Sequence, residues 1–134
     1  MSIRTEEVDE KVFTVKVEIN VKLTQQDIDD IMVAALEGGI TYWCFKAEVV
    51  GDYLGKYASE QISRGGMLKL YDIENGDKYW LDLEKFLNGF KLWVENGGDQ
   101  YGAVQGHEVD CCNIDAGCAD EIVQYALFGE VIYG

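Results

Sequence analysis

The stretch M-L-K-L-Y-D-I-E-N-G-D-K-Y-W-L, from Met67 to Leu81, decides the class of fold. Two runs rich in apolar and aromatic residues, Met67 to Ile73 and Lys78 to Leu81, flank the short polar segment Glu74 to Asp77. The pair Asn75-Gly76 accepts the positive φ angles of a tight turn, so this stretch predicts a β-hairpin. The middle of the chain is therefore expected to form two antiparallel strands.

Three further segments have the composition of strands. Val12 to Leu23 alternates strictly between apolar and polar residues, which is typical of a half-buried strand with one solvated face; its apolar members are Phe13, Val15, Val17, Ile19 and Val21. Ile40 to Val50 is dense in β-branched and aromatic residues and predicts a second strand. A short strand is expected at the C-terminal end, from Glu130 to Tyr133.

Helix signals separate these strands. Thr24 and Asp27 have the spacing of a capping box, and apolar residues at helical spacing follow, so a helix is predicted from Gln25 to Glu37, ended by Gly38-Gly39. A short helix is predicted from Ala58 to Arg64 before Gly65-Gly66. Asp82 is a plausible N-cap for a helix through Val94, before Gly97-Gly98.

The C-terminal third contains one loop and one helix. Asp99 to Asn113 is rich in glycine and polar residues and predicts a loop. Asp115 can cap a last helix, closed by Gly129, whose apolar stripe is Ala119, Ile122, Val123, Ala126 and Leu127. The whole order of elements predicts an α+β fold with a mainly antiparallel sheet and helices packed on one face. We expect one compact domain over residues 1–134, with a polar N-terminal arm over residues 1–11.

Composition narrows the function classes. The net charge is −14, from 25 acidic and 11 basic side chains, and no basic stripe could follow a phosphate backbone, so nucleic-acid binding is not expected. No run approaches the about 18 apolar residues of a membrane span, and the N-terminus lacks the apolar core of a signal peptide. We therefore expect no membrane association and a cytoplasmic location.

Metal, cofactor and catalytic signatures are weak. His107, Cys111, Cys112 and Cys118 offer four zinc-ligand types, but their spacing lacks the C-x2-4-C knuckles that orient two thiolates on one ion, so no metal or cofactor is predicted and the role of this cluster is left open. No nucleophile with a base and no phosphate loop is visible, so the chain is not expected to be an enzyme. Arg64 is the cation that we expect to face a phosphate, because guanidinium binds phosphate bidentately.

Three segments carry a family resemblance: D-I-D-D-I-M-V-A-A-L-E-G-G-I-T-Y-W-C-F-K-A-E-V at Asp27 to Val49, A-S-E-Q-I-S-R-G-G at Ala58 to Gly66, and I-V-Q-Y-A-L-F-G-E-V-I-Y-G at Ile122 to Gly134. They resemble small proteins carried by phages and prophages of Firmicutes. Within these, the chain is similar to the first type of anti-Thoeris proteins. These are cytoplasmic sponges that sequester cyclic ADP-ribose signals and, in some members, cyclic oligonucleotides.

The resemblance implies a function, an assembly and a site. The chain is expected to be a phage counter-defence protein of the host bacterial cytoplasm, a homo-oligomer based on dimers and extending to a hexamer, that binds a cyclic nucleotide signal without degrading it. Phe86 and Asn96 match a phenylalanine and an asparagine of a pocket formed where chains meet, and Arg64 matches the cation. Thr41 and Trp43, within the first matching segment, complete the predicted ligand-binding set.

A rival function from another class stays open at this stage. An acidic phage protein can block a host nuclease or another defence effector by presenting carboxylates in place of DNA phosphates, as a DNA mimic or an anti-CRISPR inhibitor does. The acids of this chain are spread over the arm, several helix starts and the loops, with no long acidic run to imitate a backbone. The sequence does not choose the ligand, the oligomer size or the immune system opposed.

Overall fold

A computed structural model of the protein describes residues 10–15, 20–99, 104–105, 108–109 and 114–134. In chain order its elements are α1 (Gln25–Ala34), the π-helical turn η2 (Ala35–Gly39), β1 (Cys44–Val50), the 3-10 turn η3 (Ala58–Glu60), β2 (Met67–Asp72), β3 (Lys78–Leu81), α2 (Leu83–Glu95), β4 (Val104–Gln105), β5 (Glu108–Val109) and α3 (Ala116–Phe128). The fold is α+β, as the sequence predicts.

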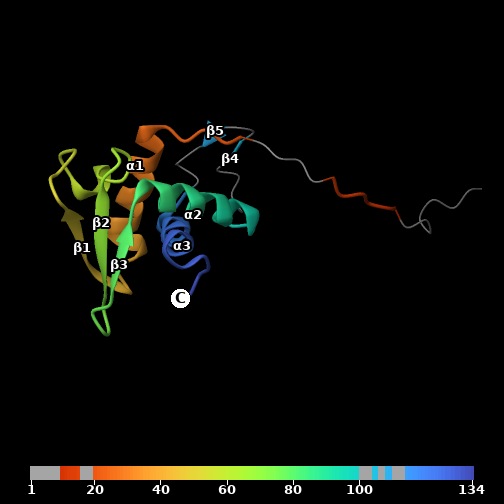
Figure 1. Ribbon diagram of the computed structural model, residues 1–134. Coiled ribbons are helices and arrows are strands. Elements are labelled where there is room, and N and C mark those ends of the chain that lie inside the picture. The colour runs from red at the N-terminus through yellow and green to blue at the C-terminus, as the bar shows by residue number, and fades with distance from the viewer. Residues whose placement is uncertain (1–9, 16–19, 100–103, 106–107, 110–113) are drawn as a thin grey trace, which may run out of the picture.

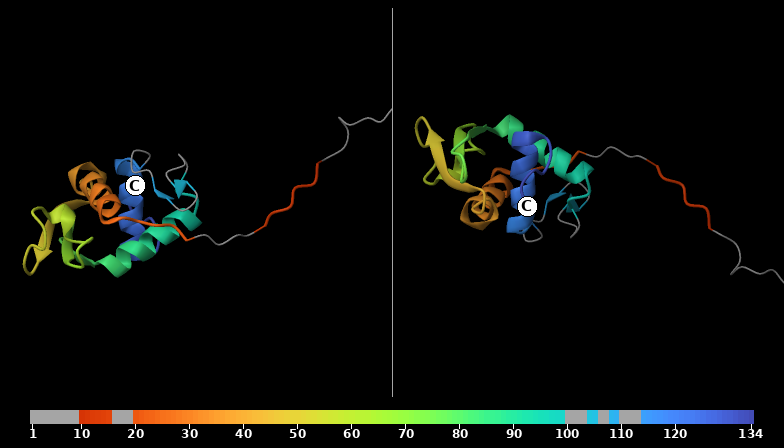
Figure 2. Two further views of the ribbon diagram at one scale, coloured as in Figure 1. Left: turned by 90° about the horizontal axis from the view of Figure 1, so that it is seen from above. Right: turned by 90° about the horizontal axis from the view of Figure 1, so that it is seen from below.

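The strands β1, β2 and β3 form one antiparallel sheet in that order, and α1, α2 and α3 lie on one side of it (Figures 1 and 2). Alternate residues of β2 enter the core, namely Leu68, Leu70 and Asp72. The intervening residues of β2 point to the opposite face, which no described helix covers. A short second hairpin, β4 with β5, lies within the segment predicted as a loop.

The predicted hairpin is confirmed, with a different turn geometry. Gly76 has a φ of 74°, but no described residue other than glycine has a positive φ, so Asn75 is not left-handed and the turn is not the two-residue type I′. The carboxylate of Asp72 holds the turn instead, because it accepts hydrogen bonds from the backbone N–H groups of Glu74 (2.7 Å) and Asn75 (3.0 Å).

The three strongest helix predictions are confirmed at their starts. Thr24 and Asp27 form the predicted capping box at α1, and the carboxylates of Asp82 and Asp115 accept from the N–H groups of Lys85 and Cys118 at α2 and α3. Local hydrogen-bonding chemistry is enough to fix these positions, since each cap needs only residues three apart in sequence.

Gly38-Gly39 does not end the first helix in the predicted way. The helix continues through Gly39 as the π-turn η2, and Gly39 has no positive φ. Its role is close approach: a Cβ at this position would collide with the backbone oxygen of Ala116 at the start of α3. Glycine is needed here because two helix ends meet, which the sequence does not reveal.

The predicted strand from Val12 to Leu23 is wrong for its described residues. Val12, Phe13 and Val15 are 78–85% exposed and lie in no strand, and residues 16–19 are outside the described residues. Val21 and Leu23 pack against the core without a strand partner. Alternation makes a strand only where a neighbouring edge accepts its hydrogen bonds, and no described strand pairs with this segment.

Three other boundaries are corrected. Ile40 to Trp43 is a turn, so the second predicted strand begins only at Cys44. The predicted helix from Ala58 to Arg64 shortens to η3 and following turns. The C-terminal strand does not form: the backbone N–H groups of Ile132 and Tyr133 both donate to the side-chain oxygen of Gln124, each at 2.8 Å, and no sheet edge is used.

Within the described residues, no helix combines the length and the apolar character that crossing a bilayer requires. The buried core joins the inner side of the sheet to all three helices, with Trp43, Phe86 and Trp93 among its largest side chains.

Candidate ligand-binding face

The residues predicted to bind a ligand do not meet in one place within the chain. Phe86 and Asn96 lie ten positions apart on and beside α2, which corresponds to about 15 Å along a helix. Thr41 donates to the carbonyl of Gly38 in the turn before β1, at 2.9 Å. Phe86 and Asn96 of one chain therefore do not face a common small ligand.

Phe86 requires a correction. Its side chain is 0% exposed and belongs to the core, so no face of the ring is free to stack on a base. Asn96 is exposed and closes the C-terminus of α2, where its amide donates to the carbonyl of Leu92 at 2.7 Å. The apolar spacing of α2 decides the position of Phe86, because that spacing turns the residue toward α3 and the sheet.

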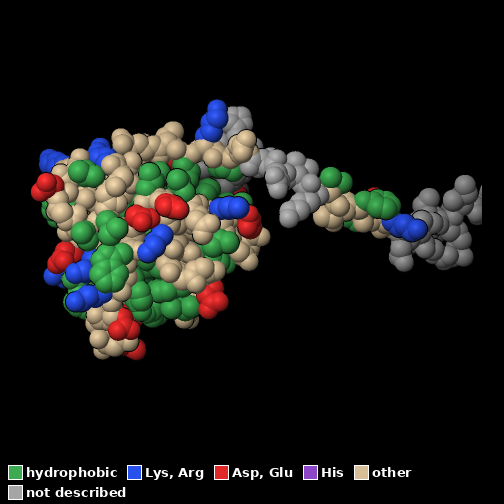
Figure 3. Space-filling model, viewed as in Figure 1, with side chains coloured by type: hydrophobic (Ala, Val, Ile, Leu, Met, Phe, Trp, Pro, Cys, Tyr) green, Lys and Arg blue, Asp and Glu red, His purple; other side chains and the backbone are tan. Residues whose placement is uncertain are grey.

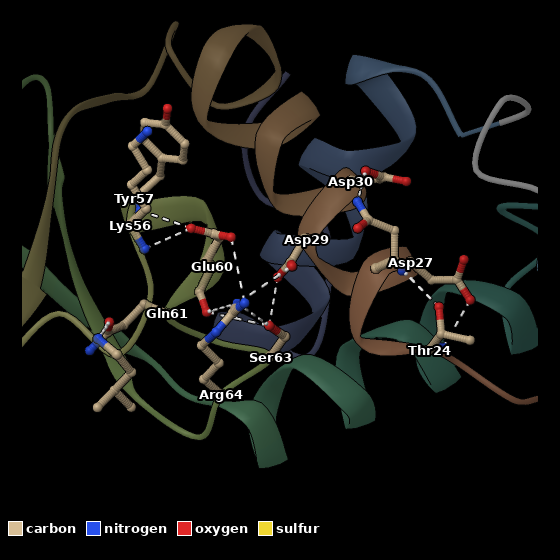
Figure 4. Close-up of polar contacts among 12 residues, drawn as sticks. Thr24, Asp27, Asp29, Asp30, Lys56, Tyr57, Glu60, Gln61, Ser63 and Arg64 are labelled. Carbon is tan, nitrogen blue, oxygen red and sulfur yellow. Dashed lines mark hydrogen bonds and ion pairs between the residues drawn. The ribbon is translucent and has the colours of Figure 1, made fainter.

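Arg64 is engaged by carboxylates. Its guanidinium lies 3.5 Å from Asp29 and 3.6 Å from Glu60, and it also donates to the carbonyl of Glu60 and to the hydroxyl of Ser63 (Figure 4). Ser63 in turn donates to Asp29 at 2.5 Å. These contacts tie the η3 turn to α1. A phosphate at Arg64 would have to compete with two carboxylates, so the geometry favours a structural role for this residue.

Trp43 is the buried member of the inner aromatic cluster, which we define as Trp43, Tyr79, Phe128 and Tyr133. The other three rings are half-buried. The Trp43 and Tyr133 rings stack with centroids 4.7 Å apart and an interplanar angle of 3°. The Trp43 indole N–H donates to Asp120 at 2.8 Å, and the same carboxylate accepts from Tyr42 and Gln124. Trp43 is 1% exposed, so it packs the core.

The polar groups around this cluster are fully used. Every buried side-chain nitrogen or oxygen in the described part of the chain has a hydrogen-bond partner. Burial and the hydrogen bond to Asp120 raise the pKa of Tyr42 to about 12, and the hydroxyl of Tyr133 donates to Asp72 at 2.5 Å. A neutral phenol that donates to a carboxylate is the stable arrangement here. The buried polar atoms around the inner aromatic cluster are therefore already hydrogen-bonded within the chain.

The opposite side of the sheet is different in chemistry. We define the outer sheet face by six of the side chains that the strand register places there: Lys46, Glu48, Lys69, Tyr71, Lys78 and Trp80. They form two rows across the three strands: Lys46, Tyr71 and Lys78 in one, and Glu48, Lys69 and Trp80 in the other. Side chains that are opposite on neighbouring strands lie within contact distance, so each row is continuous.

Three ammonium groups surround one aromatic ring on this face. The Nζ atoms of Lys46, Lys69 and Lys78 lie 5.3, 5.6 and 5.9 Å from the centroid of the Tyr71 ring. Lys69 also lies 5.7 Å from the Trp80 ring, whose residue is 41% exposed. These distances are within the range of cation–π attraction. Figure 3 shows Lys or Arg side chains gathered with hydrophobic ones over β2 and β3.

One acid moderates this positive charge. Glu48 lies 3.0 Å from Lys46 and 4.0 Å from Lys69, and it accepts from the Tyr71 hydroxyl at 3.2 Å. The hydrogen bond to Lys46 lowers the pKa of Glu48, and the same contact raises the pKa of Lys46. Three lysines against one glutamate leave the face positive, in a chain whose net charge is −14.

Sequence reasoning missed this face, although its signal was present. The chain has only two arginines, and the prediction favoured Arg64 because guanidinium binds phosphate bidentately. Lys69 and Tyr71, at alternate positions of β2, and Lys78 and Trp80, at alternate positions of β3, already indicate a cationic and aromatic face. The contribution of β1 depends on the register of a non-local pairing, which a single sequence does not give.

Metal chemistry finds no support among the described residues, where no group of three or more His, Cys, Asp or Glu side chains could hold an ion. His107, Cys111 and Cys112 lie outside the described residues. Cys118 is buried in the first turn of α3, and burial, with Asp115 nearby, raises its thiol pKa to about 11. Comparison of the chain with family models, with curated proteins and with solved structures finds no match.

Proposed function

We propose that this protein is a phage counter-defence sponge of the bacterial cytoplasm, which binds an anionic cyclic nucleotide signal of the cyclic ADP-ribose type and holds it intact. The observation that carries the proposal is the group of three lysines around Tyr71, next to the exposed Trp80. The sequence resemblance described above supplies the ligand class. The outer sheet face supplies the cationic and aromatic groups, at a place different from the site predicted around Phe86, Asn96 and Arg64.

The chemistry of the face suits such a ligand. A cyclic ADP-ribose signal combines phosphate charge with a base that has two flat faces. Ammonium groups attract the phosphates as point charges, and stacking of a base on an exposed aromatic ring contributes about 1–3 kcal/mol. Lys69 lies between the rings of Tyr71 and Trp80, so one ligand could meet a cation and an aromatic surface together.

Binding without turnover agrees with the electrostatics of Lys46. A lysine that acts as a base or forms a Schiff base needs a lowered pKa, whereas Glu48 raises the pKa of Lys46. An ammonium that stays protonated attracts anions and does not remove protons. In the described residues the outer sheet face contains no nucleophile paired with a base.

Titration calorimetry of the purified protein with cyclic ADP-ribose and its isomers tests the proposal, followed by heat denaturation and chromatography of the released ligand. We expect saturable binding and recovery of unchanged ligand. Conversion of more ligand than protein would instead establish an enzyme. Absence of binding, with a host nuclease retained stoichiometrically and released by salt, would favour the acidic inhibitor that the sequence left open.

A further inference from the structure

The strand β1 is the edge of the three-stranded sheet. It pairs with β2 on one side, and no described strand pairs with its other side. In both figures β1 lies at the margin of the molecule, away from the helices (Figures 1 and 2). An edge strand presents backbone N–H and C=O groups that can bond to another strand, and proteins usually protect such edges with charges, bulges or covering segments.

The charges on this edge are self-complementary. Lys46 and Glu48 are on the outer face, on either side of Ala47. In an antiparallel pair of two β1 strands centred on Ala47, Lys46 of each copy lies opposite Glu48 of the other. A shift of the centre to Lys46 would place two ammonium groups opposite each other, and a shift to Glu48 would place two carboxylates opposite each other. Like charges directly opposite destabilise a pair, so the charges select one register.

The apolar ends of the strand fit the same register. Phe45 and Val50, near the two ends of this short strand, are 58% and 39% exposed. Pairing centred on Ala47 brings the Phe45 end of each strand beside the Val50 end of the other. The irregular step between Cys44 and Lys46 turns Phe45 toward the outer face, where it already contacts Tyr71 with ring centroids 5.8 Å apart.

We propose that two copies of this chain pair through their β1 edges, antiparallel and centred on Ala47, to form a six-stranded sheet in the order β3-β2-β1-β1-β2-β3. The interface is isologous, since the same surface serves both copies. The pairing joins two outer sheet faces into one, with Lys46 of each copy nearest to the other. The inference does not depend on the proposed function, because it rests on strand geometry and charge alone.

Sedimentation velocity of the full chain without ligand tests the pairing. We expect the wild-type protein to be a dimer or a multiple of dimers. Lys46→Glu and Glu48→Lys each create two repulsive pairs, so each should weaken self-association by at least about tenfold. An equimolar mixture of the two variants restores both attractive pairs and should recover the dimer. Lys91→Glu, on the exposed side of α2, is the matched control and should change nothing.

Each outcome decides the proposal. A monomeric wild-type protein overturns it, and so does an oligomer that both charge variants leave unchanged. The proposal is also overturned if the two variants are monomeric, are folded by circular dichroism and still fail to associate when mixed. The proposed register requires the mixed pair to form. Ligand is absent throughout, so failure here leaves the test of the proposed function unaffected.

Discussion

The outer sheet face and the inner aromatic cluster are both rich in aromatic rings, yet they differ in what surrounds the rings. Around Trp43 and Tyr133, the nearby carboxylates of Asp120 and Asp72 accept hydrogen bonds from the chain itself. Around Tyr71 and Trp80 the polar neighbours are lysine ammonium groups, and Lys46 and Trp80 are exposed. Aromatic content alone therefore does not mark a binding site. The two regions differ in whether the polar groups beside the rings are already hydrogen-bonded within the chain.

The largest expected effect is the loss of stability on removing a buried aromatic side chain, compared with an exposed one. Phe86→Ala should lower the free energy of unfolding by about 3–5 kcal/mol, because it leaves a cavity in the core, measured by urea denaturation. Trp80→Ala should cost clearly less, since its ring is already part-solvated. A stable Phe86→Ala protein that has lost only ligand binding would place Phe86 in the binding site instead of the core.

The hydrogen-bond network of the inner aromatic cluster can be broken at one residue. Asp120→Asn replaces an acceptor of three hydrogen bonds by a group that cannot accept them all, and it should destabilise the protein by about 1–3 kcal/mol. Asp30→Asn, an exposed carboxylate of α1 bonded to Gln26, is the control and should stay near the wild-type value. Equal stability of both variants would mean that the network does not hold the cluster.

The outer sheet face can be tested by binding. Trp80→Ala and Lys69→Ala should each weaken binding of cyclic ADP-ribose by about tenfold, which is the order expected for the loss of one stacking or charge contact. Isothermal titration calorimetry measures the change, with Lys91→Ala as a lysine control away from the face. Unchanged affinity in both variants would show that the outer sheet face does not bind the ligand and that its lysines are ordinary surface residues.

A smaller effect concerns pH and the C-terminal tail. The Tyr133 hydroxyl, followed by the backbone N–H groups of Asn75 and Glu74, lowers the pKa of Asp72 below its ordinary value of 3.8. A lowered carboxyl pKa stabilises the folded protein above that ordinary value, and the stabilisation is lost as pH falls through the lowered pKa. Tyr133→Phe removes the main cause of the lowered Asp72 pKa. The loss in free energy of unfolding relative to the wild type, measured by denaturation between neutral and acid pH, should therefore be full at neutral pH and shrink in acid.

The sequence by itself determined the local elements of this protein. The caps at Thr24, Asp82 and Asp115 fixed three helix starts, and the segment from Met67 to Leu81 fixed the hairpin, because a cap or a tight turn depends on residues within a few positions of one another. Alternation in β2 and β3 likewise determined that lysine and aromatic side chains share a face.

Tertiary structure decided everything that depends on a non-local partner. It gave no strand partner to the described residues of the Val12–Leu23 segment. It also buried Phe86 and paired Arg64, in the turn after η3, with Asp29 of α1. It also set the β1 register that brings Lys46 to Tyr71. The physical reason is the same in each case: burial and charge neutralisation depend on which surfaces meet in space, and a pattern along one chain specifies only which surfaces are available to meet.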